Sequence, residues 1–357
     1  MIKYLGSKRV LVPVLGQIAA ASYSLGARTA LDLFSGTTRV AQEFKRQGFE
    51  TTACDIASYS EVLAQCYIAT DAANVDLAQL DTILQELEAL PGQAGYFTKT
   101  FCEDSHYFQV KNGMRVDAIR DEIEASYKDH PYYPILLTSL MLAADRVDST
   151  TGLQMAYLKN YSLRSHNDLE LRIPELIPGT GHAVRGDAMR LAGNMGHFDL
   201  AYLDPPYNQH RYYTNYHIWE TLIRWDAPEH YGKACKRIDA REDDTKSPFN
   251  SKKTMAQSLQ KVISDIDAST LVVSYNNESW VSASDIKSWL QEKDYEAVHV
   301  FNFDFKRYVG AKIGIFNKRG EKVGKVDHLR NIEHIIVAGS TELVDNLYEQ
   351  IEGAEHV

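Results

Sequence analysis

The sequence predicts an α/β fold in which a Rossmann-like sheet is interrupted by a mostly helical insert. Three observations indicate this class: a strand–helix–strand unit over residues 29–55, an apolar strand that ends in Asp-Pro-Pro-Tyr at residues 204–207, and about 120 residues of mostly helical sequence between them. An insert of that size is a domain rather than a loop. We therefore predict one domain from residues 1–56 and 179–357, and a second domain from residues 57–178.

Composition excludes several classes of protein. The chain has 357 residues, enough for one large domain and a smaller one, and contains no apolar run long enough to span a membrane. Its four cysteines lack the spacing of a zinc site or a disulfide framework, and its first residues are too polar for a signal peptide. These features predict a cytoplasmic protein without a metal site.

Charge is distributed unevenly along the chain. The formal net charge of −10, taken alone, argues weakly against a nucleic-acid partner. Residues 301–331, however, hold eight basic and three acidic residues. The overall charge therefore hides a basic segment near the carboxyl terminus.

The first strand–helix–strand unit has the features of a nucleoside site. Residues 29–34 form a strand, Ser35 and Gly36 a tight turn, and the second strand ends at Asp55, 19 residues after Gly36. A carboxylate at that spacing commonly binds ribose hydroxyls. Because Gly36 stands without a GxGxxG pattern, a nucleoside without phosphates suits this turn better than NAD does. A plain strand–helix–strand unit with a glycine turn is the alternative.

The insert is predicted to contain three helices, at residues 77–90, 116–128 and 134–147. Its tail then interleaves basic residues with Tyr157 and Tyr161, a pattern that suits phosphate contact and base stacking as well as a solvated loop. The basic residues of this tail are Arg146, Lys159 and Arg164.

Two further acidic residues follow strands. Asp187 ends a strand at residues 182–186, where it could accept a hydrogen bond from a nucleobase amino group or cap the next helix. Asp204 follows the apolar run 200–203 and precedes Pro205, Pro206 and Tyr207, whose prolines end the strand. A carboxylate, a rigid carbonyl and an aromatic face suit the binding of a planar, amino-bearing ring. An ordinary Asp-Pro turn is the alternative.

The remaining sequence predicts one loop and the last strands. Residues 233–253 are charged and lack periodicity, so we predict a long mobile loop that a ligand could order. Strands are predicted at residues 270–275, 298–303 and 332–337, with a hairpin over residues 313–326 whose tip is basic.

Three of these motifs together resemble the D12 class of adenine-specific DNA methyltransferases, which includes the Dam methylases and methylases of type II restriction systems. They are the segment Lys3-Tyr-Leu-Gly-Ser-Lys8, the Phe34-Ser-Gly36 turn and Asp204–Tyr207. The resemblance covers nearly the whole chain and departs from the family at Thr38, where members often have a second glycine.

The resemblance implies S-adenosylmethionine as the cofactor, double-stranded DNA as the partner, and the insert as the target-recognition domain. It implies a cofactor site made of Tyr4, Lys8, Asp32, Phe34, Ser35, Gly36, Asp55 and Asp187, and a catalytic motif made of Asp204, Pro205, Pro206 and Tyr207. A cognate restriction endonuclease is a further possible partner. Charge and loop position alone select the DNA-contact candidates Arg146, Lys159, Arg164, Lys306, Arg307, Lys318 and Arg319.

The implied reaction is methyl transfer to N6 of an adenine that has been flipped out of the duplex. Asp204 and the carbonyl of Pro205 would each accept one N6 hydrogen, and Tyr207 would stack on the base. Alternatives are methylation of cytosine N4 in DNA or of adenine in RNA, and a non-catalytic relative that only binds nucleic acid. Aspartate at position 204 disfavours cytosine as the target base, and the intact motif disfavours a relative that only binds nucleic acid.

Overall fold

The computed structural model describes residues 2–6, 8–206, 209, 211–277, 279–306 and 330–351. The chain divides into two compact units. Unit 1 consists of residues 1–191 and 210–247, and unit 2 of residues 192–209 and 248–357. Both units contain helices and strands, which confirms the predicted α/β class.

Unit 1 contains three parallel strands in the order β3-β2-β1. Their bounds are Thr29–Asp32 for β1, Glu50–Asp55 for β2 and Gly181–Arg185 for β3. Asp32 pairs with Ala53, and Asp55 pairs with Arg185. Because the three strands are parallel, their carboxyl ends lie at one edge, where Asp32, Asp55 and Asp187 follow or end them.

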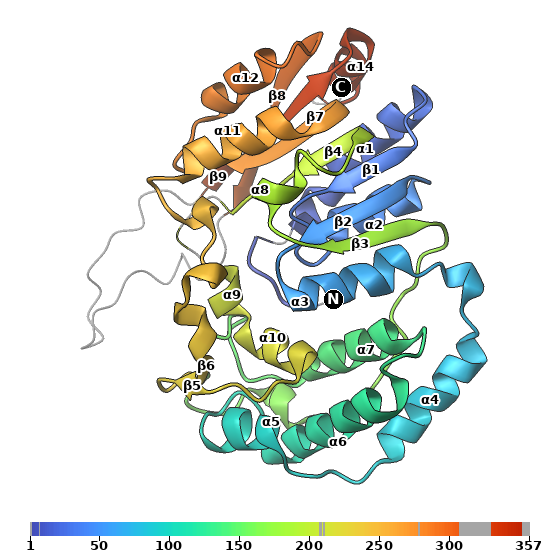
Figure 1. Ribbon diagram of the computed structural model, residues 1–357, viewed down its shortest axis with the longest axis vertical. Helices are drawn as coiled ribbons and strands as arrows, with labels where there is room; N and C mark the ends of the chain where they lie inside the picture. The colour runs from blue at the N-terminus through green and yellow to red at the C-terminus, as the bar shows by residue number, and fades with distance from the viewer. Residues whose placement is uncertain are drawn as a thin grey trace. The chain divides into compact units, whose positions relative to one another are not determined.

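The helices of unit 1 are α1 (Val12–Ser24), α2 (Arg39–Arg46), α3 (Ser58–Ala64), α4 (Leu77–Ala89), α5 (Tyr96–Thr98), α6 (Val110–Tyr127), α7 (Tyr133–Arg146), α8 (Ala188–Leu191), α9 (Tyr212–Asn215) and α10 (His217–Arg224). The three helices predicted in the insert are confirmed as α4, α6 and α7. Helix α3 packs on α7 and α10, and α6 packs on α5 and α7 (Figure 1).

A buried arginine ties α6 to the end of α10. The guanidinium of Arg120 donates to the carbonyl oxygens of Leu222 at 2.8 Å and Ile223 at 3.0 Å. It therefore caps carbonyls that the last turn of α10 leaves without partners inside the helix. Through such contacts the helices after β2 pack in one compact unit with β1–β3. Their assignment to a separate target-recognition domain of residues 57–178 stays a prediction.

Unit 2 contains strands in the order β4-β7-β9-β8. Strands β4 (His197–Leu203) and β7 (Asp267–Asn276) are parallel, whereas β9 (Arg330–Gly339) runs antiparallel to both β7 and β8 (Ala297–Lys306). The strands predicted at residues 270–275, 298–303 and 332–337 are confirmed. The helices of this unit are α11 (Met255–Asp265), α12 (Ala283–Gln291) and α14 (Thr341–Ile351). The predicted hairpin at residues 313–326 lies outside the described residues.

The prediction of a mobile loop at residues 233–253 is wrong. Strands β5 (His230–Tyr231) and β6 (Lys236–Arg237) form an antiparallel ribbon, and three short 3-10 helices follow at Ile238–Arg241, Asp243–Thr245 and Pro248–Asn250. The segment is ordered by contacts that its lack of periodicity does not reveal.

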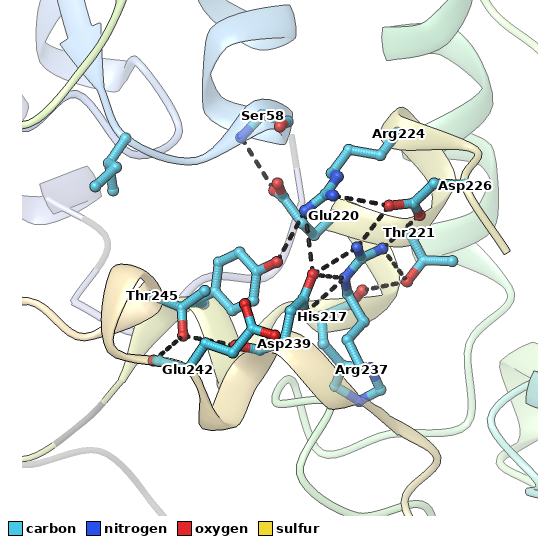
Figure 2. A network of polar contacts seen from close by, with 12 residues as sticks. Ser58, His217, Glu220, Thr221, Arg224, Asp226, Arg237, Asp239, Glu242 and Thr245 are labelled. Atoms are coloured by element: carbon cyan, nitrogen blue, oxygen red, sulfur yellow. Dashed lines mark hydrogen bonds and ion pairs between the residues drawn. The ribbon is translucent and has the colours of Figure 1, made fainter. Parts of the chain in front are cut away.

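Arg237 is the residue that holds this segment. Its side chain is only 1% exposed and binds Asp226 through two hydrogen bonds of 2.7 Å each, one to each carboxylate oxygen (Figure 2). It also donates to Asp239 at 2.8 Å and to Thr221 at 3.3 Å. Burial is the largest single influence on the pKa of the Asp226 carboxyl and would raise it, but the hydrogen bonds and charge of Arg237, together with the charge of Arg224, lower the pKa overall. The charged sequence therefore folds onto α10 around one buried guanidinium.

Among the described residues, no helix is long and apolar enough to cross a membrane. Those residues also bring together no group of three or more histidine, cysteine, aspartate or glutamate side chains that could hold a metal ion.

Candidate active site

The turn after β1 is built from backbone amides and the carboxylate of Asp55. Gly36 has φ +48°, and its amide donates to Asp55 Oδ2 at 2.8 Å. The amide of Ala57 donates to the other oxygen, Oδ1, at 3.0 Å. Burial raises the pKa of the Asp55 carboxyl, and the two amide bonds oppose that rise. The residue predicted to bind ribose thus also holds the turn together.

Tyr4 lies against Gly36. A Cβ atom at position 36 would come within 3.1 Å of the Tyr4 ring, so any other residue would require the ring to move by a few tenths of an ångström. The ring stacks on Tyr216 and Tyr212, with centroid distances of 4.7 Å and 5.2 Å. Its hydroxyl lies 3.5 Å from the hydroxyl of Tyr59. Burial is the main cause of a raised pKa at Tyr4. The structure therefore brings together Tyr4, Gly36 and Asp55, which the sequence placed in one site.

Thr38 stands where members of the resembled family often have a second glycine, and the structure shows how a threonine is accommodated there. It precedes α2 with φ +62°, a left-handed conformation that is strained for a β-branched residue and free for glycine. Its hydroxyl accepts a hydrogen bond from the Gln42 amide at 2.9 Å and donates to the Thr37 carbonyl at 2.7 Å. The backbone shape that a glycine would favour is therefore present, supported here by side-chain contacts.

The other predicted cofactor residues lie nearby on the chain or at strand ends. Lys8 and Asp32 are buried, and Asp32 Oδ2 accepts from the amide of Ala41 at 3.2 Å at the start of α2. Asp187 Oδ1 accepts from the amide of Met189 at 2.9 Å, so this residue caps α8, the alternative raised by the sequence. Its second carboxylate oxygen has further acceptor capacity.

The residues of the turn fit a nucleoside cofactor. Ser35 Oγ is buried and has no hydrogen-bond partner among the described residues. Asp55 accepts from the amides of Gly36 and Ala57, one at each carboxylate oxygen, and a carboxylate offers about four acceptor positions. The Ser35 hydroxyl can donate a hydrogen bond, and the Asp55 carboxylate can accept further hydrogen bonds. Such a pair matches a ligand that carries hydroxyl and amino groups.

The predicted catalytic motif follows β4 in unit 2. The strand is parallel to β7, with Leu203 opposite Val273, and leaves the sheet at Asp204. Asp204 and Pro206 are half-buried and Pro205 is buried. The two prolines remove amide donors and end the strand at this point. Tyr207 lies outside the described residues.

The DNA-contact candidates differ in their surroundings. Lys159 is exposed, whereas Arg164 donates to Asp148 Oδ1 through its Nε at 2.8 Å and to the carbonyl of Thr150 at 2.7 Å. Arg146 donates to the carbonyl of Glu170, and burial is the main cause of its lowered pKa. Lys306 ends β8, and its side chain lies outside the described part of the structure, as do Arg307, Lys318 and Arg319.

Sequence reasoning missed a buried carboxylate on α10. Glu220 Oε2 accepts from the amide of Ser58 at 3.0 Å, which caps the start of α3 (Figure 2). Glu220 Oε1 is buried without a hydrogen-bond partner among the described residues. Burial raises the pKa of this carboxyl. The Ser58 amide that Glu220 binds lies one residue after the Ala57 amide that binds Asp55. Helix α10 therefore supports the segment that follows Asp55, the residue predicted to bind ribose.

Tyr212 and Tyr216 were also missed. Four residues apart, they lie on one face of a helical segment, and this spacing was the only available signal. Their partner Tyr4 is more than 200 residues away in sequence. The same N-terminal segment also contacts Tyr216 through its backbone, because the amide of Leu5 donates to Tyr216 Oη across 211 residues at 2.5 Å.

Comparison with known proteins agrees with the motifs. The family model described as "D12 class N6 adenine-specific DNA methyltransferase" matches residues 4–288. The chain is 32% identical over 299 residues to the type II methyltransferase M.NlaIII of Neisseria lactamica, covering 80% of this chain and 86% of that protein. It is 28% identical over 304 residues to the type II methyltransferase M.CviAII of Paramecium bursaria Chlorella virus 1, covering 82% and 88%.

A third relative is longer. The modification methylase StsI of Streptococcus sanguinis is 30% identical over 325 residues, covering 86% of this chain but 49% of that protein, so the chain spans about half its length. The resemblance noted from three short motifs is therefore confirmed across most of the sequence. By this evidence the chain belongs to the D12 class of N6 adenine-specific DNA methyltransferases.

Proposed function

We propose that unit 1 binds S-adenosylmethionine at the turn after β1 and that the motif after β4 directs its methyl group to N6 of an adenine flipped out of double-stranded DNA. The cofactor part of this proposal rests on one observation, which is that Tyr4, Gly36 and Asp55 lie together in one cluster. When bound, the cofactor supplies an electrophilic methyl group on a positively charged sulfur.

Each residue of the turn has a proposed part in binding. Asp55 accepts hydrogen bonds from the ribose hydroxyls, using lone pairs that the Gly36 and Ala57 amides leave over. Tyr4 and Lys8 would hold the methionine end of the cofactor, and Asp32, Phe34, Ser35 and Gly36 would line the rest of it. The second carboxylate oxygen of Asp187 accepts from the adenine amino group of the cofactor while Oδ1 caps α8.

The adenine amino group of the substrate is a poor nucleophile, because its lone pair is delocalised into the ring. Asp204 accepts one N6 hydrogen and the carbonyl of Pro205 accepts the other, which restores the lone pair and fixes its direction. Tyr207 stacks on the base. The motif can hold this geometry rigidly because two prolines restrict the backbone next to Asp204. Positioning and electrostatics supply most of the acceleration in such a transfer.

The test of this assignment is Asp204→Ala. Methyl transfer from labelled S-adenosylmethionine to duplex DNA should fall below detection, while cofactor affinity measured by calorimetry stays within about twofold. Asp267→Ala is the matched control. Asp267 is the first residue of the neighbouring strand β7, and Val273, which pairs with Leu203 next to Asp204, lies much further along that strand. Near-normal turnover by Asp204→Ala would remove Asp204 from the mechanism.

The same reaction separates the remaining alternatives. Nucleoside analysis of the product by mass spectrometry distinguishes N6-methyladenine from N4-methylcytosine, and matched RNA and DNA substrates distinguish the polymers. Because the named relatives are type II methyltransferases and modification methylases, we also propose a place in a restriction-modification system with a cognate endonuclease. Expression in a methylation-free host followed by single-molecule sequencing returns the modified base and the recognised sequence.

A further inference from the structure

Strands β5 and β6 of unit 1 form a short antiparallel ribbon over residues 230–237, here called the β5–β6 ribbon (Figure 1). Its turn is closed by a hydrogen bond of 3.1 Å from the amide of Cys235 to the carbonyl of Gly232. At its base, the amide of Ile238 donates to the carbonyl of Glu229 at 2.8 Å. The backbone of the ribbon is therefore hydrogen-bonded at both of its ends.

The base of the β5–β6 ribbon is anchored on the helices of unit 1. Buried Arg237 binds both carboxylate oxygens of Asp226 and donates to the hydroxyl of Thr221 on α10 (Figure 2). Tyr96 on α5 donates to the carbonyl of Pro228 at 2.5 Å. A partner that binds the ribbon does not have to order it first, so little conformational entropy is lost on binding.

The register of the β5–β6 ribbon divides its side chains between two faces. Cross-strand partners share a face, and successive residues of a strand alternate between faces. His230 pairs with Arg237, whose side chain points into the protein, and Tyr231 pairs with Lys236 on the opposite face. The guanidinium of Arg241 lies over the Tyr231 ring, 3.8 Å from its centroid. The outer face therefore carries an aromatic ring and two cations.

The cations of this outer face lack acidic partners. Exposed Lys233 in the turn, Lys236 and Arg241 form no ion pair with the described residues, in contrast to Arg237 and Lys246 of the same segment. Burial lowers the pKa of the half-buried Lys236 ammonium, and no carboxylate opposes that shift. Partly burying an unpaired cation costs free energy, which an anion bound to this face would offset.

We propose that the β5–β6 ribbon is a contact surface for duplex DNA, on which Lys233, Lys236 and Arg241 bind backbone phosphates. A two-stranded ribbon fits the major groove, and the phosphates beside the groove supply the missing anions. The Tyr231 ring holds the Arg241 guanidinium flat, which suits two-point binding of a phosphate.

Duplex DNA is favoured over an acidic protein because the chain belongs to a DNA methyltransferase family. The inference rests on the proposed function. None of these three cations is among the DNA-contact candidates selected from the sequence, because their segment was expected to be a mobile loop.

The test is the salt dependence of binding to a fluorescein-labelled duplex, followed by anisotropy from about 50 to 300 mM salt. Each phosphate contact contributes about 0.9 to the slope of log K against log salt. The triple variant Lys233→Ala/Lys236→Ala/Arg241→Ala should therefore lower the slope by about 2–3, and each single variant by about 1. Because phosphates carry no sequence information, the loss of affinity should agree within about twofold on duplexes of unrelated sequence.

Lys128→Ala is the matched control. Lys128 is an exposed lysine of unit 1, but its ammonium is paired with Glu124 at 2.5 Å. This variant should keep the slope of the wild type. All four variants replace side chains outside the core, so their melting temperatures should equal that of the wild type.

Crosslinking measures the contact directly. All four native cysteines are buried, so Lys233→Cys introduces an exposed thiol that can be labelled selectively with a photoactivated aryl azide. Irradiation in the presence of duplex DNA should join the labelled position 233 to the DNA. The same label at Lys128→Cys should give at least about tenfold less product.

Four results would overturn the proposal. They are an unchanged slope in the triple variant, a loss of affinity confined to one DNA sequence, equal crosslinking at positions 233 and 128, and a change in self-association without a change on DNA. Failure of the proposed function is distinguishable, because methyl transfer is measured separately. A wild type that binds duplex DNA through the ribbon but transfers no methyl group to adenine would contradict the proposed function alone.

Discussion

The turn after β1 and the loop of residues 148–166, here called the 148–166 loop, are built in opposite ways. Both contact the N-terminal segment, the turn through Tyr4 and the loop through Lys3, whose Nζ lies 3.2 Å from Asp148 Oδ1. In the turn, backbone amides of Gly36 and Ala57 converge on the carboxylate of Asp55, and the backbone defines the shape. In the loop, side chains converge on Asp148 and hold Leu163 out. One unit therefore holds one segment through its backbone amides and another through its side chains.

Removing the carboxylate of Asp148 should have the largest effect. Asp148→Ala leaves Arg164 and Lys3 without their shared acceptor, and we expect the free energy of unfolding to fall by about 2–3 kcal/mol. The estimate is at the lower end for broken buried pairs because both cations are 35% exposed and can be hydrated. Urea unfolding measures the loss.

Asp168→Ala is the control for this experiment. Asp168 binds Lys111 at 2.6 Å but is 90% exposed, so its removal should leave stability nearly unchanged. If the two variants lose the same stability, the side-chain contacts of Asp148 contribute little to the stability of the fold. The 148–166 loop and the turn after β1 would then not differ in the way described above.

Gly36→Ala tests the backbone side of the comparison. At φ +48° an alanine is strained, and its Cβ would lie 3.1 Å from the Tyr4 ring, so we expect a loss of about 1–2 kcal/mol in stability. Cofactor affinity should also fall, because Tyr4 must move. Gly26→Ala, at φ +105° with nothing within 4 Å of the new atom, has the strain without the contact.

Because φ +105° is more strained for alanine than φ +48°, the contact of Tyr4 with Gly36 is measured by the difference in cofactor affinity between the two variants and not by stability. If Gly26→Ala and Gly36→Ala keep cofactor affinity equally, the close approach of Tyr4 has no importance for the site.

The smallest expected effect concerns Glu220 and depends on pH. Burial raises the pKa of this carboxyl above its ordinary value of 4.5, so the folded state disfavours its ionised form. The stability of the wild type therefore falls relative to a variant that cannot ionise as pH rises above about 4.5. Glu220→Gln, whose amide oxygen can still accept from Ser58, should gain stability relative to the wild type between pH 4 and pH 8.

Thermal unfolding of both proteins across that range checks the sign. A difference between variant and wild type that stays constant with pH would show that Glu220 ionises as easily in the folded chain as in the unfolded one. Cofactor affinity in the same buffers shows whether the cap on α3 affects Asp55.

Much of the fold could be predicted because its signals are local. The helices α4, α6 and α7 follow from apolar residues at helical spacing, and the end of β4 follows from two prolines. The spacing of Gly36 and Asp55 likewise indicated a turn facing a carboxylate, which the hydrogen bond of 2.8 Å confirms. The order in residues 233–253 could not be predicted, because Arg237 is one of several basic residues in a charged run and nothing local marks it as the buried one.

The sequence alone determined the α/β class, the glycine turn and the Asp-Pro-Pro-Tyr motif, since each depends on neighbouring residues and on the conformations they permit. Only the tertiary structure decided that Tyr4 lies on Gly36, that Glu220 caps α3 across 162 residues, and that Asp148 binds Lys3 across 145 residues. Such contacts depend on which surfaces pack together when the core forms, and no local pattern records them.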